Sequence, residues 1–276
     1  LKVQDGCNQF CSYCAIPFAR GRERSLNHDE VIQIAKDLCE KGHTEIVLTG
    51  IHTGRYFDGE YDLAKLMKAL LENTPESVYY RISSIEITEV SDELIALMQE
   101  NPRMCHHLHI PVQSACNETL KRMNRPYTIE EFKEKINYIR SCIPDISIST
   151  DVIAGFVQES DEEFETTYKN LTDLELSFFH VFPYSKRNGT KASTLKGEIN
   201  GKIAKARVAR LLELSNACRE KDMKRFNPVQ VLIERKQDGY YTGYTNQYHP
   251  CKILSDTPLS GRITIEWDHI EDGTYY

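Results

Sequence analysis

The stretch Cys7-Asn8-Gln9-Phe10-Cys11-Ser12-Tyr13-Cys14 carries three cysteines at C-x3-C-x2-C spacing, near the start of a chain of 276 residues. Three thiolates on one short loop can bind three irons of a cubane [4Fe–4S] cluster, which leaves the fourth iron without a protein ligand. An open metal position is typical of catalytic rather than structural metal sites. A small ligand with an amine and a carboxylate could fill it, and the methionine part of S-adenosylmethionine is such a ligand.

Zinc and disulfides are the alternatives for clustered cysteines. A structural zinc site usually has four Cys or His ligands, commonly in C-x2-C pairs, and no second pair follows here. His28 and His43 could supply a fourth ligand, but both fit better on a helix surface. Disulfide scaffolds are short and cysteine-dense, whereas this chain has nine cysteines in 276 residues. The spacing therefore favours an iron–sulfur cluster.

The composition is that of an ordinary soluble protein, with 40% hydrophobic and 27% charged residues. No run of about 18 apolar residues occurs, so we expect no membrane span, and thiolate ligands fit a reducing, cytoplasmic location. The net charge of −7 argues against a protein that coats nucleic acid, but it allows a local basic patch. Because residue 1 is Leu and leads directly into a strand, we expect a piece of a longer chain.

Strand and helix patterns alternate up to residue 225. Helices are expected near 28–41, 63–72, 92–100, 117–124, 129–143, 160–174 and 201–225, several of them opened by capping residues. Six strands are expected at 1–4, 45–49, 78–84, 107–110, 146–153 and 178–182. This alternation predicts βαβ units and a parallel sheet, curled as a partial (β/α)6 barrel with its helices on one side.

Polar residues and glycines follow the predicted strands, where a barrel of this kind carries its site. They are Cys7 to Cys14, Thr49-Gly50, Ser83-Ser84 with Glu86, Gln113-Ser114, Asp151 to Gly155, and Pro183-Tyr184-Ser185. We expect this rim to bind a nucleoside-like cofactor.

Residues 226–276 change character, which divides the chain into domains 1–225 and 226–276. Short β-rich runs separated by turn signals predict a small antiparallel β-barrel or sandwich. Its aromatic residues could stack on bases or pack the barrel. They are Tyr240, Tyr241, Tyr244, Tyr248 and Trp267. Four Lys and Arg against seven Asp and Glu make this segment a poor RNA binder by itself.

Longer strings resemble a known family. The cysteine stretch, with an aromatic residue before its third cysteine, resembles the radical SAM enzymes. Further strings are similar to the methylthiotransferases, most closely to the branch that modifies N6-threonylcarbamoyladenosine (t6A) in tRNA. They are Gln4 to Cys11, Leu48-Thr49-Gly50-Ile51-His52, Arg81-Ile82-Ser83-Ser84-Ile85-Glu86, His107 to Ser114, Arg122 to Thr128, and Thr150-Asp151-Val152-Ile153. The resemblance covers nearly the whole chain, and residues 226–276 resemble the family's TRAM domain, a small β-barrel that helps to hold tRNA.

The resemblance implies a [4Fe–4S] cluster on Cys7, Cys11 and Cys14 that binds S-adenosylmethionine and cleaves it to a 5′-deoxyadenosyl radical. The radical would attack C2 of t6A at tRNA position 37, where a methylthio group is added. Other residues would bind the cofactor: Tyr13 against the adenine, Thr49 and Gly50 near the methionine amine, and Ser84, Gln113, Asp151, Ile153 and Tyr184 at strand ends. The resemblance further implies a monomer that binds the tRNA anticodon loop and takes electrons from a flavodoxin or ferredoxin.

The chain also departs from the family pattern. Family members carry an N-terminal domain with three more cysteines for a second [4Fe–4S] cluster, the sulfur source. We expect that domain to be missing, because the other six cysteines here are scattered. The family's Gly-Phe-Pro-Gly-Glu-Thr turn reads Gly155-Phe156-Val157-Gln158-Glu159-Ser160, Ser114-Ala115 replaces Ser-Gly, and Lys186 replaces a proline. A radical SAM enzyme of another reaction type and an inactive tRNA-binding fragment are the alternatives, and the intact cysteine trio counts against the second.

Basic residues near the predicted rim are the candidates for RNA contact. Three groups follow strands: Arg20, Arg22 and Arg24; Lys121, Arg122 and Arg125; and Lys186 with Arg187. The helix at 201–225 adds eight Lys and Arg against three acids, including Lys221, Lys224 and Arg225. That helix either contacts RNA or presents a solvated basic face.

Overall fold

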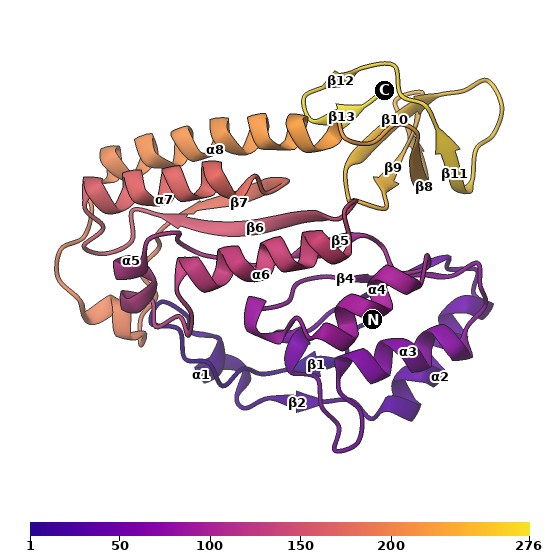
Figure 1. Cartoon of the computed structure of the whole chain (residues 1–276). Helices are drawn as coiled ribbons and strands as arrows, with labels where there is room; N and C mark the ends of the chain where they lie inside the picture. Colours follow the sequence, from indigo (N-terminus) through magenta and orange to yellow (C-terminus); the bar gives the residue numbers. More distant parts are fainter.

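A parallel sheet and a second, mostly antiparallel sheet build the structure, a computed structural model that describes all residues 1–276 (Figure 1). The strands of the first part are β1 (Gln4–Asp5), β2 (Arg24–Ser25), β3 (Glu45–Leu48), β4 (Tyr79–Ile82), β5 (His107–His109), β6 (Ser147–Ala154) and β7 (Phe178–Pro183). Its helices are α1 (Ile16–Arg20), α2 (His28–Glu40), α3 (Leu63–Asn73), α4 (Asp92–Glu100), α5 (Asn117–Arg122), α6 (Ile129–Cys142), α7 (Asp161–Leu174) and α8 (Gly201–Met223).

The parallel strands follow one another in chain order. β3 pairs with β4, and β6 pairs with β5 and β7, all in parallel. Isolated parallel bridges, Lys2 to Thr49 and Tyr80 to Met104, join the chain start to β3 and connect the two groups. Six strand segments therefore run in sequence, as the alternation predicted. The antiparallel pair of β1 and β2 and the short helix α1 were not predicted.

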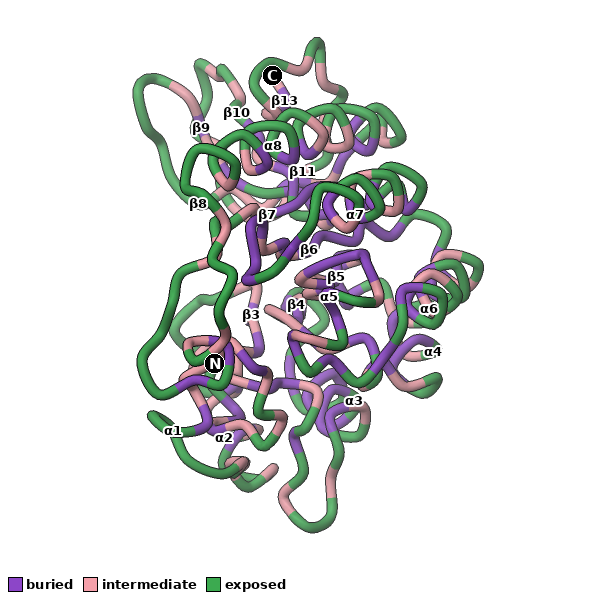
Figure 2. Tube along the Cα trace, turned by 90° about the vertical axis from the view of Figure 1, so that its left-hand side faces the viewer, coloured by how far each residue is buried: buried purple, intermediate pink, exposed green.

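Capping and burial explain why the helices form where they do. Thr128 and Ser160 complete the capping boxes of α6 and α7, and Ser91 caps α4. The strands contribute buried side chains such as Leu48 and Ile148 to one core cluster of 42 residues. In Figure 2 strands β5 and β6 are mostly buried, while the outer faces of the helices are exposed. No helix combines the length and apolar character that crossing a membrane requires.

The second sheet forms from the chain after α8. Its strands pair in the order β11-β8-β9-β10-β13-β12, and only β10 and β13 run in parallel. The bounds are β8 (Val229–Gln237), β9 (Tyr240–Thr245), β10 (Pro250–Leu254), β11 (Gly261–Ile265), β12 (Ile270–Glu271) and β13 (Thr274–Tyr275). The edge strands β11 and β12 do not pair with each other, so the sheet stays open where a closed barrel was expected.

The second sheet packs against the N-terminal ends of the parallel strands. Arg262 of β11 binds Glu45, the first residue of β3, at 2.7 Å, and its guanidinium stacks on Tyr79, the first residue of β4. Arg81 donates to the backbone carbonyls of Thr245 and Asn246 at 3.2 and 3.0 Å. In Figure 1 this sheet lies at one end of the molecule and α1 at the other.

Candidate iron–sulfur centre

The three cysteines of the first stretch line one hollow of about 210 Å³. All three thiols are free. Backbone hydrogen bonds hold their loop in place: the Cys7 N–H donates to the Gly21 carbonyl at 3.2 Å, and the Ser12 N–H to the Met123 carbonyl at 2.9 Å. Gly6 has a φ of +77°, and a Cβ there would lie 2.0 Å from the Arg22 carbonyl oxygen. The loop therefore requires glycine at this position.

Nitrogen atoms surround the cysteine sulfurs. The Gln9 backbone N–H donates to Cys7 Sγ at 3.4 Å, and Arg125 Nη1 donates to Cys11 Sγ at 3.5 Å. Such donors stabilise sulfurs that carry negative charge and tune iron–sulfur centres. Burial raises the pKa of the Cys14 thiol, so iron binding would have to draw this sulfur into its thiolate form. The donor set fits a cluster held by three thiolates.

A buried ion pair lies against the loop from Cys7 to Cys14, which we call the cluster loop. Arg125 binds the Glu86 carboxylate and also donates to the Pro111 carbonyl at 3.0 Å and to Tyr127 Oη at 2.8 Å. Only 8% of Arg125 is exposed. The expectation that Arg125 contacts RNA is therefore wrong, because its guanidinium faces the cluster loop from inside the protein.

His52 joins the same site from the segment after β3. Its Nδ1 lies 3.5 Å from Cys7 Sγ and 3.2 Å from Glu23 Oε1, and its Nε2 lies 2.7 Å from Glu89 Oε1. Burial alone would lower the pKa of His52, but Cys7 and Glu89 outweigh this and raise it to about 10. A positive imidazolium beside Cys7 attracts the negative charge that this sulfur carries when it binds iron. The sequence did not single out His52 as a site residue. It is, however, the last residue of the string Leu48-Thr49-Gly50-Ile51-His52 at the end of the second predicted strand.

Three of the predicted cofactor residues, Tyr13, Ser84 and Gln113, line the hollow with the cysteines. Gln113 adopts a φ of +66°, which is uncommon for a residue with a side chain. Its backbone bridges to β6, since its N–H donates to the Asp151 carbonyl and its carbonyl accepts from the Ile153 N–H, both at 2.8 Å. This links the cysteine hollow to the C-terminal half of β6.

The other predicted cofactor residues lie around the hollow rather than on its lining. Thr49 and Gly50 directly precede Ile51, which lines it. Ile153 and Tyr184 pack with Tyr13 in an apolar cluster around Phe156. The Asp151 carboxylate lies 3.2 Å from His109 Nε2. All these residues collect at the C-terminal ends of the strands, as the fold predicted.

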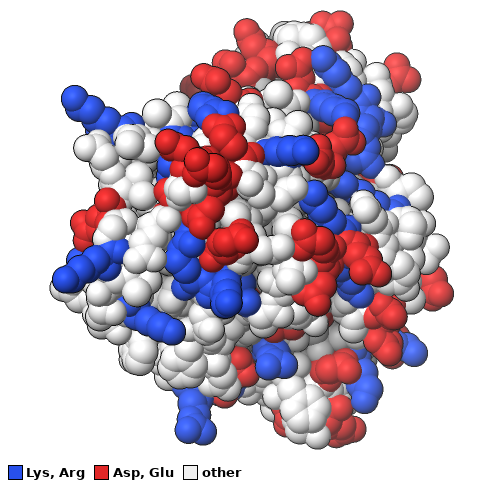
Figure 3. All heavy atoms as spheres, turned by 60° about the vertical axis from the view of Figure 1, so that its left-hand side comes forward, with Lys and Arg blue, Asp and Glu red and all other residues white.

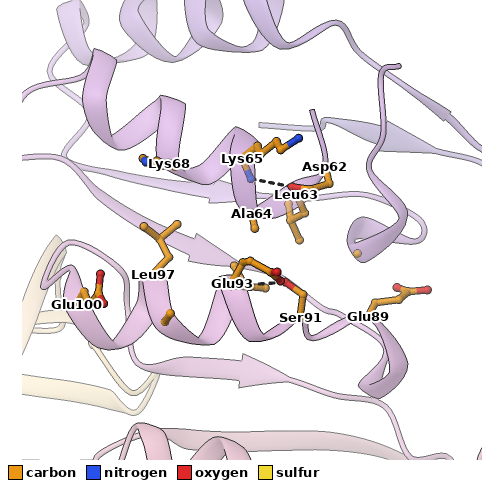
Figure 4. A pocket seen from close by; sticks show the side chains of 13 residues that line it. Asp62, Leu63, Ala64, Lys65, Lys68, Glu89, Ser91, Glu93, Leu97 and Glu100 are labelled. Carbon is orange, nitrogen blue, oxygen red and sulfur yellow. Dashed lines mark hydrogen bonds between the residues drawn. The ribbon is translucent and has the colours of Figure 1, made fainter. Parts of the chain in front are cut away.

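A larger hollow of about 580 Å³ lies between α3 and α4 (Figure 4). It contains no cysteine. Two of its polar side chains are occupied in capping these helices: Asp62 accepts from the Lys65 N–H, and Ser91 from the Leu94 N–H. We therefore assign the chemistry to the smaller, cysteine-lined hollow.

The structure divides the basic residues into paired and unpaired groups. Most of those predicted to contact RNA are engaged by acids. The pairs are Arg24 with Asp5, Arg122 with Glu163, Lys186 with Glu198, Lys221 with Glu175, Lys224 with Glu220 and Arg225 with Asp222. Arg20, Arg22, Lys121 and Arg187 are exposed and lack an acidic partner within 4.0 Å. Among these candidates, the unpaired ones therefore follow the cysteine stretch, β5 and β7 rather than the C-terminal end of α8.

Residues 1–171 match the Radical SAM superfamily. The chain belongs to this superfamily. Radical SAM proteins use a [4Fe–4S] cluster and S-adenosylmethionine, and the three free cysteines of the hollow suit the cluster. This radical SAM chain is 38% identical over 272 residues to the threonylcarbamoyladenosine tRNA methylthiotransferase MtaB of Bacillus subtilis, covering 95% of this chain and 60% of that protein.

A second relative of the radical SAM chain is the tRNA-2-methylthio-N(6)-dimethylallyladenosine synthase of Thermodesulfovibrio yellowstonii. It is 37% identical over 264 residues, covering 95% of this chain and 61% of that protein. The chain thus spans about 60% of the length of these curated relatives. Among solved structures, the radical S-adenosylmethionine methyltransferase TsrM of Kitasatospora setae aligns with a TM-score of 0.59 at 14% identity, covering 70% of this chain and 38% of TsrM. That likeness concerns the fold alone.

Proposed function

We propose that the chain is the radical SAM part of a tRNA methylthiotransferase that adds a methylthio group to C2 of t6A at position 37, in the anticodon loop. The observation that carries this proposal is the trio of free cysteines on a hollow at the strand ends, with nitrogen donors aimed at two of the sulfurs. The likeness to both relatives supports a tRNA substrate, and the likeness to MtaB of Bacillus subtilis supports t6A as the nucleoside.

In this proposal Cys7, Cys11 and Cys14 hold the cluster. When bound and reduced, the cluster supplies the electron that cleaves S-adenosylmethionine. Arg125 and His52 stabilise the charge on the cysteine sulfurs from two sides. The hydrogen bond of Arg125 to Cys11 Sγ and the contact of His52 with Cys7 Sγ support these roles.

The remaining predicted residues would position the cofactor. Tyr13 presents its ring to the adenine, supported by its place on the hollow beside the apolar cluster around Phe156. Thr49 and Gly50 would meet the methionine amine. Polar contacts would come from Ser84, Gln113 and Asp151, and apolar ones from Ile153 and Tyr184. Holding the cofactor rigidly is how such residues contribute to catalysis.

Residues 226–276 would form a TRAM-like domain distinct from residues 1–225. Their sheet packs at the N-terminal ends of the strands, and the eight residues of β6 separate that end from the cluster loop by about 26 Å. A tRNA body, but not a single nucleotide, could span this distance. The enzyme would act as a monomer and receive electrons from a flavodoxin or ferredoxin.

Anaerobic reconstitution with iron and sulfide tests the proposal. We expect about four irons per chain, reductant-dependent formation of 5′-deoxyadenosine, and tighter binding of an anticodon stem-loop RNA that carries t6A than of the same RNA with adenosine. Cleavage without any preference for the t6A RNA would reject t6A as the substrate and favour a radical SAM enzyme of another reaction type.

A further inference from the structure

An exposed aromatic pair lies beside the cysteine loop. Phe10 stands between Cys7 and Cys11 and is 53% exposed, and Phe18 on α1 is 68% exposed. Their ring centroids are 5.8 Å apart, with the planes at 70°. Large apolar side chains that stay in water next to a catalytic loop are typical of binding surfaces.

The backbone holds Phe10 in this position. Its φ is +50°, and its carbonyl accepts a hydrogen bond from Asn124 Nδ2 at 3.1 Å. Asn124 itself adopts a φ of +59°. Two neighbouring turns are thus held in left-handed conformations, which cost free energy for residues with side chains. The aromatic pair is therefore presented by a fixed local structure.

Unpaired cations surround this pair. Arg20 and Arg22 lie two and four residues after Phe18, and Lys121 lies in the last turn of α5, three residues before the Asn124 that binds Phe10. All three are exposed and have no acid within 4.0 Å. In Figure 3, where the side of the molecule that carries α1 and α5 comes forward, Lys and Arg lie among uncharged atoms at the lower left, while Asp and Glu gather above and to the right. Arg20, Arg22 and Lys121 therefore keep positive charge that no acid contacts, although the chain as a whole carries −7.

We propose that Phe10 and Phe18, with Arg20, Arg22 and Lys121, form a surface that binds single-stranded RNA, with a base stacked on Phe18 and phosphates held by the arginines. Exposed aromatic rings and unpaired cations are the two components by which proteins bind unpaired nucleotides. This inference rests on the proposed function and deepens it, because it assigns the contact with the loop nucleotides beside the target base. RNA is a better occupant than a protein, because the unpaired guanidinium groups would bind phosphates more strongly than they would bind a protein surface.

The test uses the reconstituted chain and an anticodon stem-loop RNA, with affinity measured by fluorescence anisotropy over a salt series. Phe18→Ala should weaken binding about five- to thirtyfold, whereas Phe18→Tyr should stay within about twofold of the wild type because it retains a stacking ring. The double variant Arg20→Gln/Arg22→Gln should reduce the log–log salt slope by about 1.4. A fully paired RNA duplex should bind without any effect of Phe18→Ala.

Matched controls lie elsewhere on the surface. Tyr138→Ala removes an exposed ring from α6, and Lys65→Gln/Lys68→Gln removes two exposed, unpaired cations from α3, so neither should change the affinity. Iron content equal to that of the wild type shows that each variant keeps its loop. If the wild type binds the RNA and both surface variants bind it equally well, this proposal is overturned and the proposed function stands. If the wild type binds no RNA, both are overturned.

Discussion

At the scale of single residues, the proposed cluster would depend on three sulfurs. Cys11→Ala removes one ligand and leaves a site with two, so we expect loss of the brown absorbance and of S-adenosylmethionine cleavage. Cys142→Ala is the matched control, because Cys142 is a free cysteine on α6, outside the cysteine-lined hollow. Iron counting and absorbance spectra give the result. Close to four irons per chain in the Cys11 variant would contradict the assignment.

Arg125 combines a structural and an electronic role. Arg125→Met leaves the Glu86 carboxylate without its partner and should lower the free energy of unfolding by about 3–5 kcal/mol. It also removes a positive donor from Cys11 Sγ, so the midpoint potential of the cluster should become more negative. Adding Glu86→Leu should restore part of the stability but not the potential. Denaturant unfolding and a redox titration followed by electron paramagnetic resonance separate the two effects.

At the scale of elements, the cations in the last turn of α8 and just after it stabilise the fold. Arg225 binds Asp222 and donates to the Pro144 carbonyl at 2.6 Å, whereas Lys221 and Lys224 form exposed pairs. Replacing all three with Gln should lower the free energy of unfolding by about 1–3 kcal/mol, most of it from Arg225. The salt slope of RNA binding should stay unchanged, unlike that of the Arg20 and Arg22 variant. Lys221→Gln/Lys224→Gln serves as a control that should leave the free energy of unfolding nearly unchanged. A flatter salt slope in the variant with all three replacements would show that these residues do contact RNA.

At the scale of the whole molecule, a buried polar cluster joins the two sheets. Asp222 accepts from His249 Nε2 at 2.8 Å and from the Ser147 hydroxyl, so α8, the second sheet and β6 meet at one carboxylate. Burial alone would raise the pKa of Asp222, but His249, Ser147 and Arg225 outweigh it and lower the pKa. The contribution of Asp222 to stability is therefore complete above its unfolded pKa of about 3.8 and is lost as the pH falls through its lower folded value.

Asp222→Asn should consequently lower the free energy of unfolding by about 1–3 kcal/mol at pH 7, and the difference from the wild type should shrink in acid. Trp267, the single tryptophan, reports on the second sheet because its Nε1 donates to the Phe226 carbonyl at 2.5 Å. Its fluorescence during denaturant unfolding at several pH values gives the measurement. A difference that stays constant down to pH 3 would show that Asp222 does not titrate in this way.

Local patterns determined much of this protein. The cysteine spacing indicated the cluster loop, and the alternation of strands and helices predicted the parallel order and the rim that carries the site. The capping residues of α6 and α7 marked helix starts correctly because a cap needs only neighbours within one turn. Gln158 stands where the family turn has glycine, and it adopts a φ of +67°. Its N–H donates to the Gly197 carbonyl and its side-chain amide to the Lys196 carbonyl, which hold the turn. The division near residue 226 and the roles of the cofactor residues stay predictions.

Only the tertiary structure decided which charges are available. Arg125 and Arg20 look alike in the sequence, but Arg125 is buried against Glu86, 39 residues away, while Arg20 is exposed and has no acidic partner. His52 reaches Cys7 across 45 residues, and the second sheet packs at the end of the strands remote from the cluster loop. Spacing and periodicity describe what a residue does within its own helix, strand or turn. Burial and ion pairing depend instead on segments that meet only after the chain has folded, and so the unpaired positive charge and the polar surroundings of the three cysteines could not be inferred from the sequence.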